Sequence, residues 1–422
     1  MQIYLESLGC RLNQSEIEYM ARRFDAAGHV LVGDPAQADA CILNTCAVTV
    51  EAARKSRQRA RALRRANAGS PVAVVGCYAT LAPERCATLA GPTTVVIPNP
   101  EKDRTVEEVI RAVGPETESF PPAARVAWGG RTRAFVKVQD GCDNRCTYCI
   151  VRHLRGPGRS RPLERVVDEV RTLTDCEGYR EAVLTGVNLG SYGRDLGMVD
   201  GLRRLVDTLL AETDLPRLRL SSLEPWDVDE TFFELWEDPR VCRQLHLPLQ
   251  AGYDETLRRM GRRITSAEFA RLADAAREAI PDVALTTDVM VGFPGEDEAA
   301  FRASYDFVER MAFARLHVFR YSPRPGTPAV KLPNRVPREV AKARSRRMRK
   351  LGAAQARRFR ERFVGRTMSV LWEQRREDGR WSGLTDNYIR VLAPCAGDLH
   401  NRLTETRLME AEGAHLVGEV IQ

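Results

Sequence analysis

The chain of 422 residues has 43% hydrophobic and 29% charged residues and a formal net charge of +7, values ordinary for a globular protein. At roughly 100–200 residues per domain, this length predicts two to four domains. No run of about 18 apolar residues occurs, which excludes a membrane-spanning helix. The first eight residues read as a strand rather than as a signal peptide, so a cytoplasmic protein is expected.

Short apolar runs alternate with helical patterns over residues 1–113. The pattern predicts strands at 3–7, 40–44, 72–75 and 93–97, and helices at 14–27, 48–66, 83–89 and 105–113. Such alternation indicates a doubly wound α/β domain with a largely parallel sheet. Residues 114–128 contain three prolines and no periodic pattern, which is typical of a linker.

A second series of strands and helices fills residues 129–360. Strands are expected at 135–138, 181–184, 217–220, 244–247, 285–291 and 315–319, and helices at 163–173, 202–212, 267–279 and 297–311. About six βα units in succession predict a partial (βα)6 barrel. A proline-rich stretch at 323–337 ends the series. The remaining segment, 361–422, has strand-like patches at 368–372, 388–392 and 416–421 and predicts a small β module.

Three of the eleven cysteines form a C-x3-C-x2-C motif directly after a predicted strand: Cys142, Cys146 and Cys149. Disulfides are rare in the cytoplasm, so metal or redox chemistry is the first hypothesis. Three thiolates on one loop can ligate three irons of a [4Fe–4S] cluster and leave the fourth iron for a small molecule. A zinc site is the alternative, for which His153 is the only fourth ligand at plausible range in the sequence.

Three other cysteines, Cys10, Cys46 and Cys77, each follow a predicted strand of the first domain. The carboxyl ends of parallel strands meet at one edge of a sheet, so these thiols can converge on a second cluster. Taken singly, each is equally well a buried small hydrophobe. The remaining cysteines share no common context and are expected to be packing residues or incidental thiols: Cys41, Cys86, Cys176, Cys242 and Cys395.

Polar and glycine-containing turns follow the predicted barrel strands, among them Gly186, Asn188, Gln250 and Gly292. Ligand-binding groups of βα barrels gather at the carboxyl ends of the strands. Each turn alone is explained by chain reversal, but several on one face favour a binding site.

The cysteine loop, with Tyr148 before its third cysteine, resembles that of radical S-adenosylmethionine (SAM) enzymes, which have full or partial βα barrels. Two three-cysteine sites followed by a β tail resemble the methylthiotransferases. This resemblance implies a methylthiotransferase domain (1–113), a linker (114–128), a radical SAM core (129–360) and a TRAM module (361–422).

The resemblance also implies roles for the residues quoted above. Cys142, Cys146 and Cys149 would hold the catalytic [4Fe–4S] cluster, at which SAM is cleaved to a 5′-deoxyadenosyl radical. Cys10, Cys46 and Cys77 would hold an auxiliary [4Fe–4S] cluster. SAM would bind at the strand ends, and a flavodoxin- or ferredoxin-type protein would donate electrons. The SAM-binding residues implied are Gly186, Asn188, Gln250 and Gly292.

Segments 9–16, 184–193 and 217–225 look most like the MtaB branch of this family. That branch adds a methylthio group to C2 of N6-threonylcarbamoyladenosine 37 in the anticodon stem-loop of tRNA. The alternatives are the MiaB branch, which acts on N6-isopentenyladenosine 37, and the branch that modifies a ribosomal protein. A different class of protein, a non-catalytic iron–sulfur RNA-binding regulator, would need no SAM pocket.

Two stretches are strongly basic. Residues 54–65 contain seven basic residues and no acidic one, and residues 335–366 contain thirteen basic residues against two acidic ones. Helices carrying such stripes can neutralise RNA phosphates, although a charge run is often only a solvated face. By contrast, residues 367–422 contain six arginines and nine acidic residues, so this tail either contacts RNA through a small patch or mainly packs against the barrel. Trp372 and Trp381 are expected in its core.

Overall fold

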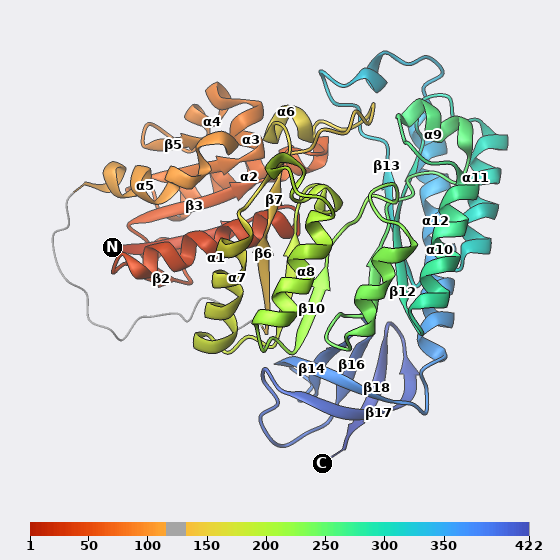
Figure 1. Ribbon diagram of the computed structural model, residues 1–422. Coiled ribbons are helices and arrows are strands. Elements are labelled where there is room, and N and C mark those ends of the chain that lie inside the picture. The colour runs from red at the N-terminus through yellow and green to blue at the C-terminus, as the bar shows by residue number, and fades with distance from the viewer. Residues whose placement is uncertain (115–131, 422) are drawn as a thin grey trace.

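The computed structural model describes residues 1–114 and 132–421 and has three parts in chain order (Figure 1). An α/β domain is followed by a central partial barrel and a small closed β-barrel. Apart from Gly114, the predicted linker lies outside the described residues. No helix among the described residues has the length and apolar character needed to cross a membrane.

The N-terminal domain contains a parallel five-stranded sheet in the order β2-β1-β3-β4-β5. The two central strands, β3 and β4, are buried throughout, as expected for a sheet covered by helices on both faces. The four predicted strands are confirmed, whereas the three-residue β2 was not predicted. The bounds are β1 Gln2–Ser7, β2 Val30–Val32, β3 Ala40–Thr45, β4 Val72–Gly76 and β5 Thr94–Ile97, with helices α1 Arg11–Ala26, α2 Val50–Ala66, α3 Cys77–Leu81, α4 Pro83–Leu89 and α5 Thr105–Val113.

All six predicted strands of the central region are present and parallel. They form two three-stranded sheets, β6-β9-β10 and β11-β12-β13, which a bridge between Ser222 and His246 joins into one curved layer. No ladder joins β6 to β13 among the described residues, so the barrel is partial, and α1 packs beside β6. The strands are β6 Arg133–Lys137, β9 Glu181–Thr185, β10 Arg217–Leu220, β11 Gln244–His246, β12 Ala284–Val291 and β13 Arg315–Arg320.

Helices cover the outer face of this curved layer, and one hydrophobic core lies between them and the strands. The longest helix, α12, packs along β13 and leads to the C-terminal module (Figure 1). The helices are α6 Val151–Arg155, α7 Leu163–Arg171, α8 Gly201–Glu212, α9 Asp254–Met260, α10 Ser266–Ala279, α11 Glu298–Met311 and α12 Arg338–Glu361, and a short ladder pairs β7 Gln139–Asp140 with β8 Arg159–Ser160.

The C-terminal module is a closed barrel in the order β14-β15-β16-β18-β17. Trp372 is fully buried and donates a hydrogen bond to Thr404 Oγ1 (2.8 Å), and Trp381 is buried as well, which confirms the expectation of core packing. Strands β15 and β17 were not predicted. The bounds are β14 Thr367–Arg375, β15 Trp381–Thr385, β16 Arg390–Ala393, β17 Leu403–Glu412 and β18 His415–Val420.

The module docks below the amino-terminal ends of the central strands (Figure 1). Arg219 of β10 donates to the carbonyl oxygen of Asp386 (2.7 Å) and forms an ion pair with Glu181 of β9 (2.7 Å). Tyr388, at the tip of the same module loop, accepts hydrogen bonds from Arg11 (2.8 Å) and Arg133 (3.2 Å). The loop therefore joins all three parts of the molecule.

Candidate functional site

The loop that carries Cys142, Cys146 and Cys149, here called the loop cysteines, follows β7. Gly141 begins the loop with φ +71°, and a Cβ there would lie 1.8 Å from the carbonyl oxygen of Pro157, so only glycine fits. The buried side chain of Gln139 donates to the carbonyl oxygen of Gly141 (2.9 Å) and accepts from the backbone N–H of Asn188 (3.0 Å). Gln139, which sequence reasoning did not identify, thus ties the cysteine loop to the end of β9.

The loop cysteines are half-buried and lie beside a buried cation. Burial raises the pKa of all three thiols, that of Cys149 to about 12. Nη1 of Arg262 lies 4.0 Å from Sγ of Cys146, and Arg262 also pairs with Glu224 (2.7 Å). A guanidinium at this distance favours a thiolate at Cys146.

The arrangement fits a multi-iron cluster better than a single zinc ion. Among the described residues, no three His, Cys, Asp or Glu side chains converge closely enough to hold one metal ion. Tetrahedral zinc needs its ligands about 2.0–2.3 Å from one point. Thiolates that bind separate irons of a cluster need no such convergence. His153, the fourth zinc ligand considered above, is exposed on α6.

Two polar side chains at neighbouring strand ends are buried without a protein partner. Asn188, after β9, is 4% exposed, and within the described part of the chain its Oδ1 accepts no hydrogen bond. Ser221, after β10, is 7% exposed and its Oγ is likewise unpaired there. Leaving such atoms unsatisfied costs about 1–3 kcal/mol each. A polar ligand bound beside the cysteine loop would satisfy both, which fits the predicted SAM site.

The other predicted SAM-binding residues have clear structural roles. A Cβ on Gly186 would lie 2.9 Å from Oε1 of Gln139, so this glycine permits the contact that ties down the loop. Gln250 has φ +71°. Its backbone N–H donates to the carbonyl oxygen of Asp288 (2.8 Å), which joins the segment after β11 to β12. Gly292 has φ +76° and its missing side chain faces α12, where a Cβ would lie 2.6 Å from that of Ala341. Packing against α12 therefore accounts for this glycine.

Cys10, Cys46 and Cys77, here called the N-terminal cysteines, lie at one edge of the first sheet. Cys10 precedes α1, Cys46 follows β3, and Cys77 begins α3 directly after β4. A Cβ on Gly9 would lie 2.8 Å from Cβ and 3.1 Å from Sγ of Cys46, so the loops that carry Cys10 and Cys46 touch. Burial raises the pKa of Cys46 to about 11 and also raises the pKa of Cys10. The charge of Cys77 contributes to both increases. The structure thus brings the three thiols together.

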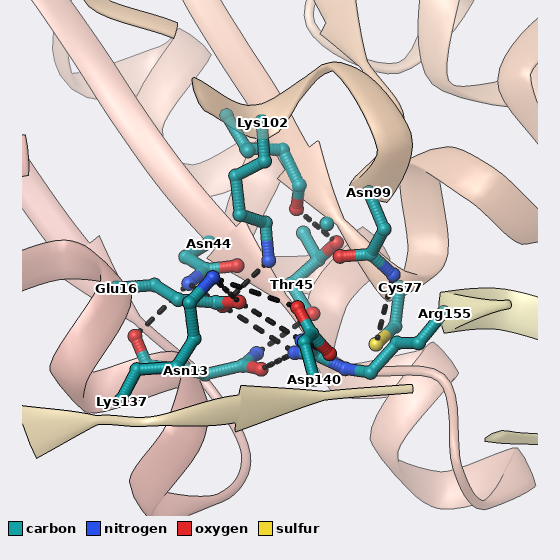
Figure 2. A network of polar contacts seen from close by, with 12 residues as sticks. Asn13, Glu16, Asn44, Thr45, Cys77, Asn99, Lys102, Lys137, Asp140 and Arg155 are labelled. Carbon is teal, nitrogen blue, oxygen red and sulfur yellow. Dashed lines mark hydrogen bonds and ion pairs between the residues drawn. The ribbon is translucent and has the colours of Figure 1, made fainter. Parts of the chain in front are cut away.

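Amide side chains lie beside two of the N-terminal cysteines, and Figure 2 shows Asn99 next to Cys77. Asn99 donates to Sγ of Cys77 (3.4 Å), and Sγ of Cys10 donates to Oδ1 of Asn13 (3.7 Å). Asn13 also donates to the carbonyl oxygens of Leu8 (2.7 Å) and Thr45 (2.9 Å). These contacts fix the backbone on both sides of the site.

A buried ion network around Glu16, shown in Figure 2, joins the segments that carry the two cysteine sites. Arg155 of α6, six residues beyond Cys149, pairs with Glu16 of α1 (2.9 Å) and with Asp140 of β7 (2.8 Å). Lys102 approaches the same Glu16 (2.5 Å). The cations Arg155 and Lys102 hold the pKa of Glu16 well below its usual value despite burial, which acts in the opposite direction. Arg155 also donates to Asn13 (2.7 Å), so the helix after the loop cysteines is anchored beside Cys10.

The remaining cysteines agree with the expectation of packing residues or incidental thiols. Cys41, Cys86 and Cys242 are buried, and burial raises the pKa of each thiol to about 12. Cys395 is half-buried against the core of the C-terminal module, whereas Cys176 is exposed.

The two basic stretches lie largely on helices α2 and α12, and some of their charges are already paired. On α2, Arg59 pairs with Glu6 (2.6 Å) and Arg54 with Glu51 (2.5 Å). On α12, buried Arg344 pairs with Glu296 (2.8 Å). Within the described residues, Lys55, Arg61 and Arg65 of α2 are exposed and form no ion pair, so they are the residues of α2 that remain free to meet phosphates.

Comparisons with protein families match two parts of the chain. Residues 2–97 match a family described as "Uncharacterized protein family UPF0004", and residues 136–308 match the radical SAM superfamily. Among solved structures, the radical SAM methyltransferase TsrM from Kitasatospora setae superposes with a TM-score of 0.57 at 16% identity, over 78% of this chain and 76% of that one. This likeness confirms the predicted fold class.

Curated proteins similar to the chain extend over nearly its whole length. A threonylcarbamoyladenosine tRNA methylthiotransferase MtaB from Thermotoga maritima is 37% identical over 397 residues, 92% of this chain and 90% of the relative. The MtaB protein of Bacillus subtilis is 32% identical over 100% of this chain and 96% of its own length. A tRNA-2-methylthio-N(6)-dimethylallyladenosine synthase from Jannaschia sp. is 33% identical over 100% and 94%, respectively.

Proposed function

The chain belongs to the radical SAM tRNA methylthiotransferases, and from this we propose that it adds a methylthio group to C2 of N6-threonylcarbamoyladenosine 37 in tRNA. The observation that carries the proposal is near full-length similarity to MtaB proteins in a chain that also carries both three-cysteine sites. The enzyme uses two [4Fe–4S] clusters and SAM.

We assign the catalytic cluster to Cys142, Cys146 and Cys149 and the auxiliary cluster to Cys10, Cys46 and Cys77. When bound, the catalytic cluster and SAM supply the radical that removes hydrogen from the substrate carbon, and the auxiliary site supplies the methylthio sulfur. The polar atoms of Asn188 and Ser221 offer hydrogen bonds to SAM beside the loop cysteines. Gly186 and Gln250 shape the ends of β9 and β11, and Gly292 lets α12 pack against the end of β12.

Other residues of the chain hold these sites in place. Arg262 places a positive charge beside Cys146, which lowers the pKa of this thiol against the larger, opposite effect of burial. Gln139 anchors the cysteine loop to β9, and Arg155 anchors it to the N-terminal domain through Glu16. The two clusters would then face a common substrate at a fixed separation.

The domain division that supports this activity follows the order of an α/β domain, a partial barrel and a closed β-barrel along the chain. We propose a methylthiotransferase domain at 1–113, a radical SAM core at 129–360 and a TRAM module at 361–422. The tRNA would be engaged through its anticodon stem-loop. We also propose a cytoplasmic location, where tRNA is modified, and a flavodoxin- or ferredoxin-type electron donor.

The test is methylthiolation of defined RNA by the reconstituted enzyme. Three anticodon stem-loops that differ only at position 37 carry threonylcarbamoyladenosine, isopentenyladenosine or adenosine. Mass spectrometry of the digested RNA should find the methylthio product chiefly from the first. A product chiefly from the isopentenyl substrate would keep the chemistry and move the chain to the activity named for its Jannaschia relative. No product from any of the three would overturn the proposal.

A further inference from the structure

Two histidines that lie far apart in the sequence meet on one face of the central barrel. His246 of β11 and His317 of β13 have ring centroids 5.5 Å apart. Asp288 of β12 lies between them, with Oδ1 3.5 Å from Nε2 of His246 and 4.0 Å from Nδ1 of His317. Thr286 Oγ1 lies 2.9 Å from Nδ1 of His246. None of these side chains has a role in holding either cluster.

This face is the inner face of the barrel. The strand register pairs His317 with Asp288, and the alternate residues of β13, Leu316 and Val318, pack into the core shared with the outer helices. His317 and Phe319 therefore project inward. The side chain of His317 is 40% exposed and Phe319 is 44% exposed, so the inner face of β13 is accessible rather than filled by packing.

The histidine pair is linked to the loop cysteines by contacts at the end of β11, where Arg262 donates to the carbonyl oxygen of Pro248 and the backbone N–H of Gln250 donates to that of Asp288 (2.8 Å). Arg262 lies 4.0 Å from Sγ of Cys146 and pairs with Glu224. Burial raises the pKa of Glu224, and the charges of Asp227 and Asp288 raise it further. Asp288 and the loop cysteines are thus connected through Arg262 and its contacts.

The N-terminal domain contributes a cation near this face. Arg11, the residue after Cys10, donates to the hydroxyl of Tyr388 (2.8 Å) and has no carboxylate partner within the described residues. Burial lowers the pKa of His317 to about 4, although Asp288 acts in the opposite direction. The charges of His246, Arg315 and Arg11 also lower this pKa. Arg11 is therefore close to His317. Its remaining donors make it the cation available to an acidic ligand.

The chemistry of this face matches one of the two candidate substrates. A threonylcarbamoyl group has a carboxylate, a hydroxyl and N–H donors, whereas a dimethylallyl group has only carbon and hydrogen. Arg11 can neutralise the carboxylate, Asp288 can accept from an N–H or hydroxyl, and neutral His317 can donate one hydrogen bond. The exposed ring of Phe319 can stack on the flipped-out adenine.

We propose that Arg11, His246, Asp288 and His317 form the subsite for the acidic N6 substituent of the target adenosine, with Phe319 beneath the base. This inference rests on the proposed function and names the residues that determine its substrate. A site built to hydrogen-bond a polar group discriminates strongly against an analogue that lacks it, because its own polar groups are then left unpaired. The subsite therefore selects the threonylcarbamoyl nucleoside over the dimethylallyl one.

The experiment compares R11Q and H317L with the wild-type holoenzyme. The affinity for, and kcat/KM on, the threonylcarbamoyl stem-loop and the unmodified stem-loop are measured, together with iron content. Each variant should lose about 10- to 100-fold in affinity for the threonylcarbamoyl RNA, as expected for one hydrogen bond to a charged group, and less than about 3-fold for the unmodified RNA. R320Q is the control, because Arg320 also lies on β13 but on its other face. Its register partner Val291 packs into the core under the outer helices. R320Q should leave the ratio of the two affinities unchanged.

The outcomes separate this inference from the proposed function. If the wild-type enzyme forms no methylthio product on the threonylcarbamoyl stem-loop, the proposed function fails and the subsite fails with it. If the wild type is active but both variants keep its preference for that stem-loop, or lose affinity equally for both RNAs, the subsite alone is overturned. His317 is not adjacent in sequence to any of the six cysteines, whereas Arg11 follows Cys10, so H317L decides the matter should R11Q bind less iron.

Discussion

At the scale of single residues, the most consequential finding is how much charge is buried where the three parts meet. The side chains of Arg219 and Glu181 are fully buried and pair at 2.7 Å. Glu181 and the nearby Tyr388 raise the pKa of Arg219 against the effect of burial, so the pair remains ionised. Removing one member of such a pair leaves an uncompensated buried charge.

We expect E181Q to lower the free energy of unfolding by about 3–5 kcal/mol, because Arg219 then loses its counter-ion in a fully buried position. D306N is the matched control, since Asp306 pairs with Arg302 at the surface and such pairs contribute about 0–1 kcal/mol. Urea and thermal denaturation of both variants provide the comparison. Equal, small losses in the two variants would contradict the structural role assigned to Glu181.

The lowered pKa of His317 predicts an acid-sensitive fold. Its pKa is about 4 in the folded protein, against an ordinary value of 6.5, so the unfolded chain binds the extra proton first as the pH falls. Stability contributed by the neutral imidazole is complete above pH 6.5 and is lost progressively toward pH 4. The groups that face it are His246, Asp288, Arg315 and Arg11.

H317N should therefore lose less stability than the wild type between pH 7 and pH 4.5. Denaturation at several pH values measures the difference between the two slopes, in which the titration of other groups cancels. Parallel slopes would show that His317 is not held neutral in the folded state.

Sequence reasoning identified the residues with strong local signals and missed those that depend on folding. The six cysteines could be found because each set has a fixed place after predicted strands. Glu16 and Arg155 belong to different domains, and nothing in the local sequence marks them as a buried pair. His246 and His317 carry no local sequence signal, because their proximity arises from the register of β11, β12 and β13, which the sequence does not reveal.

At the scale of elements, apolar periodicity was a reliable guide wherever an element is buried on a clear face. All six central strands were predicted, and α4 and α5 have the predicted bounds. Of the missed strands, β2 and β17 are short or largely exposed, whereas β15 is buried throughout but has Ser, Gly and Thr interrupting its apolar pattern. β2 has three residues, and most of β17 is exposed or half-buried, so its polar sequence carries little apolar signal.

The basic helices show that charge in a sequence is an upper limit on charge available to RNA. On α2, charge reversal in the variant K55E/R61E/R65E removes the exposed cations that form no ion pair among the described residues. Each lost phosphate contact reduces the slope of log affinity against log salt by about 0.7–0.9. We expect weaker tRNA binding and a slope reduced by about 2–3.

The control for α2 is R271E/R302E/R310E, which changes the charge equally on exposed residues of α10 and α11. Titration of labelled tRNA at several salt concentrations measures both variants. If the control weakens binding as much as the α2 variant, only overall charge matters and α2 is a solvated face.

At the scale of the whole molecule, the central feature is two cysteine sites on separate domains joined by one ion network. Arg155 reaches from the helix after the loop cysteines to Glu16 and Asn13 beside the N-terminal cysteines. The separation of the sites is therefore set by buried contacts rather than by the linker alone.

The two sites should be separable by mutation. Replacing Cys142, Cys146 and Cys149 with alanine should halve the iron content and abolish cleavage of SAM to 5′-deoxyadenosine. Replacing Cys10, Cys46 and Cys77 should also halve the iron, but should leave SAM cleavage in place while methylthio product is lost. Iron analysis and product chromatography test both statements. Full iron content in either triple variant would contradict the ligand assignment.

The most direct test of the account is nucleoside mass spectrometry of tRNA from cells with and without this gene. We predict that deletion removes the methylthio form of threonylcarbamoyladenosine and leaves its unmethylthiolated precursor in its place. Persistence of that methylthio nucleoside in the deletion strain would contradict the account, whether or not the methylthio form of isopentenyladenosine is lost.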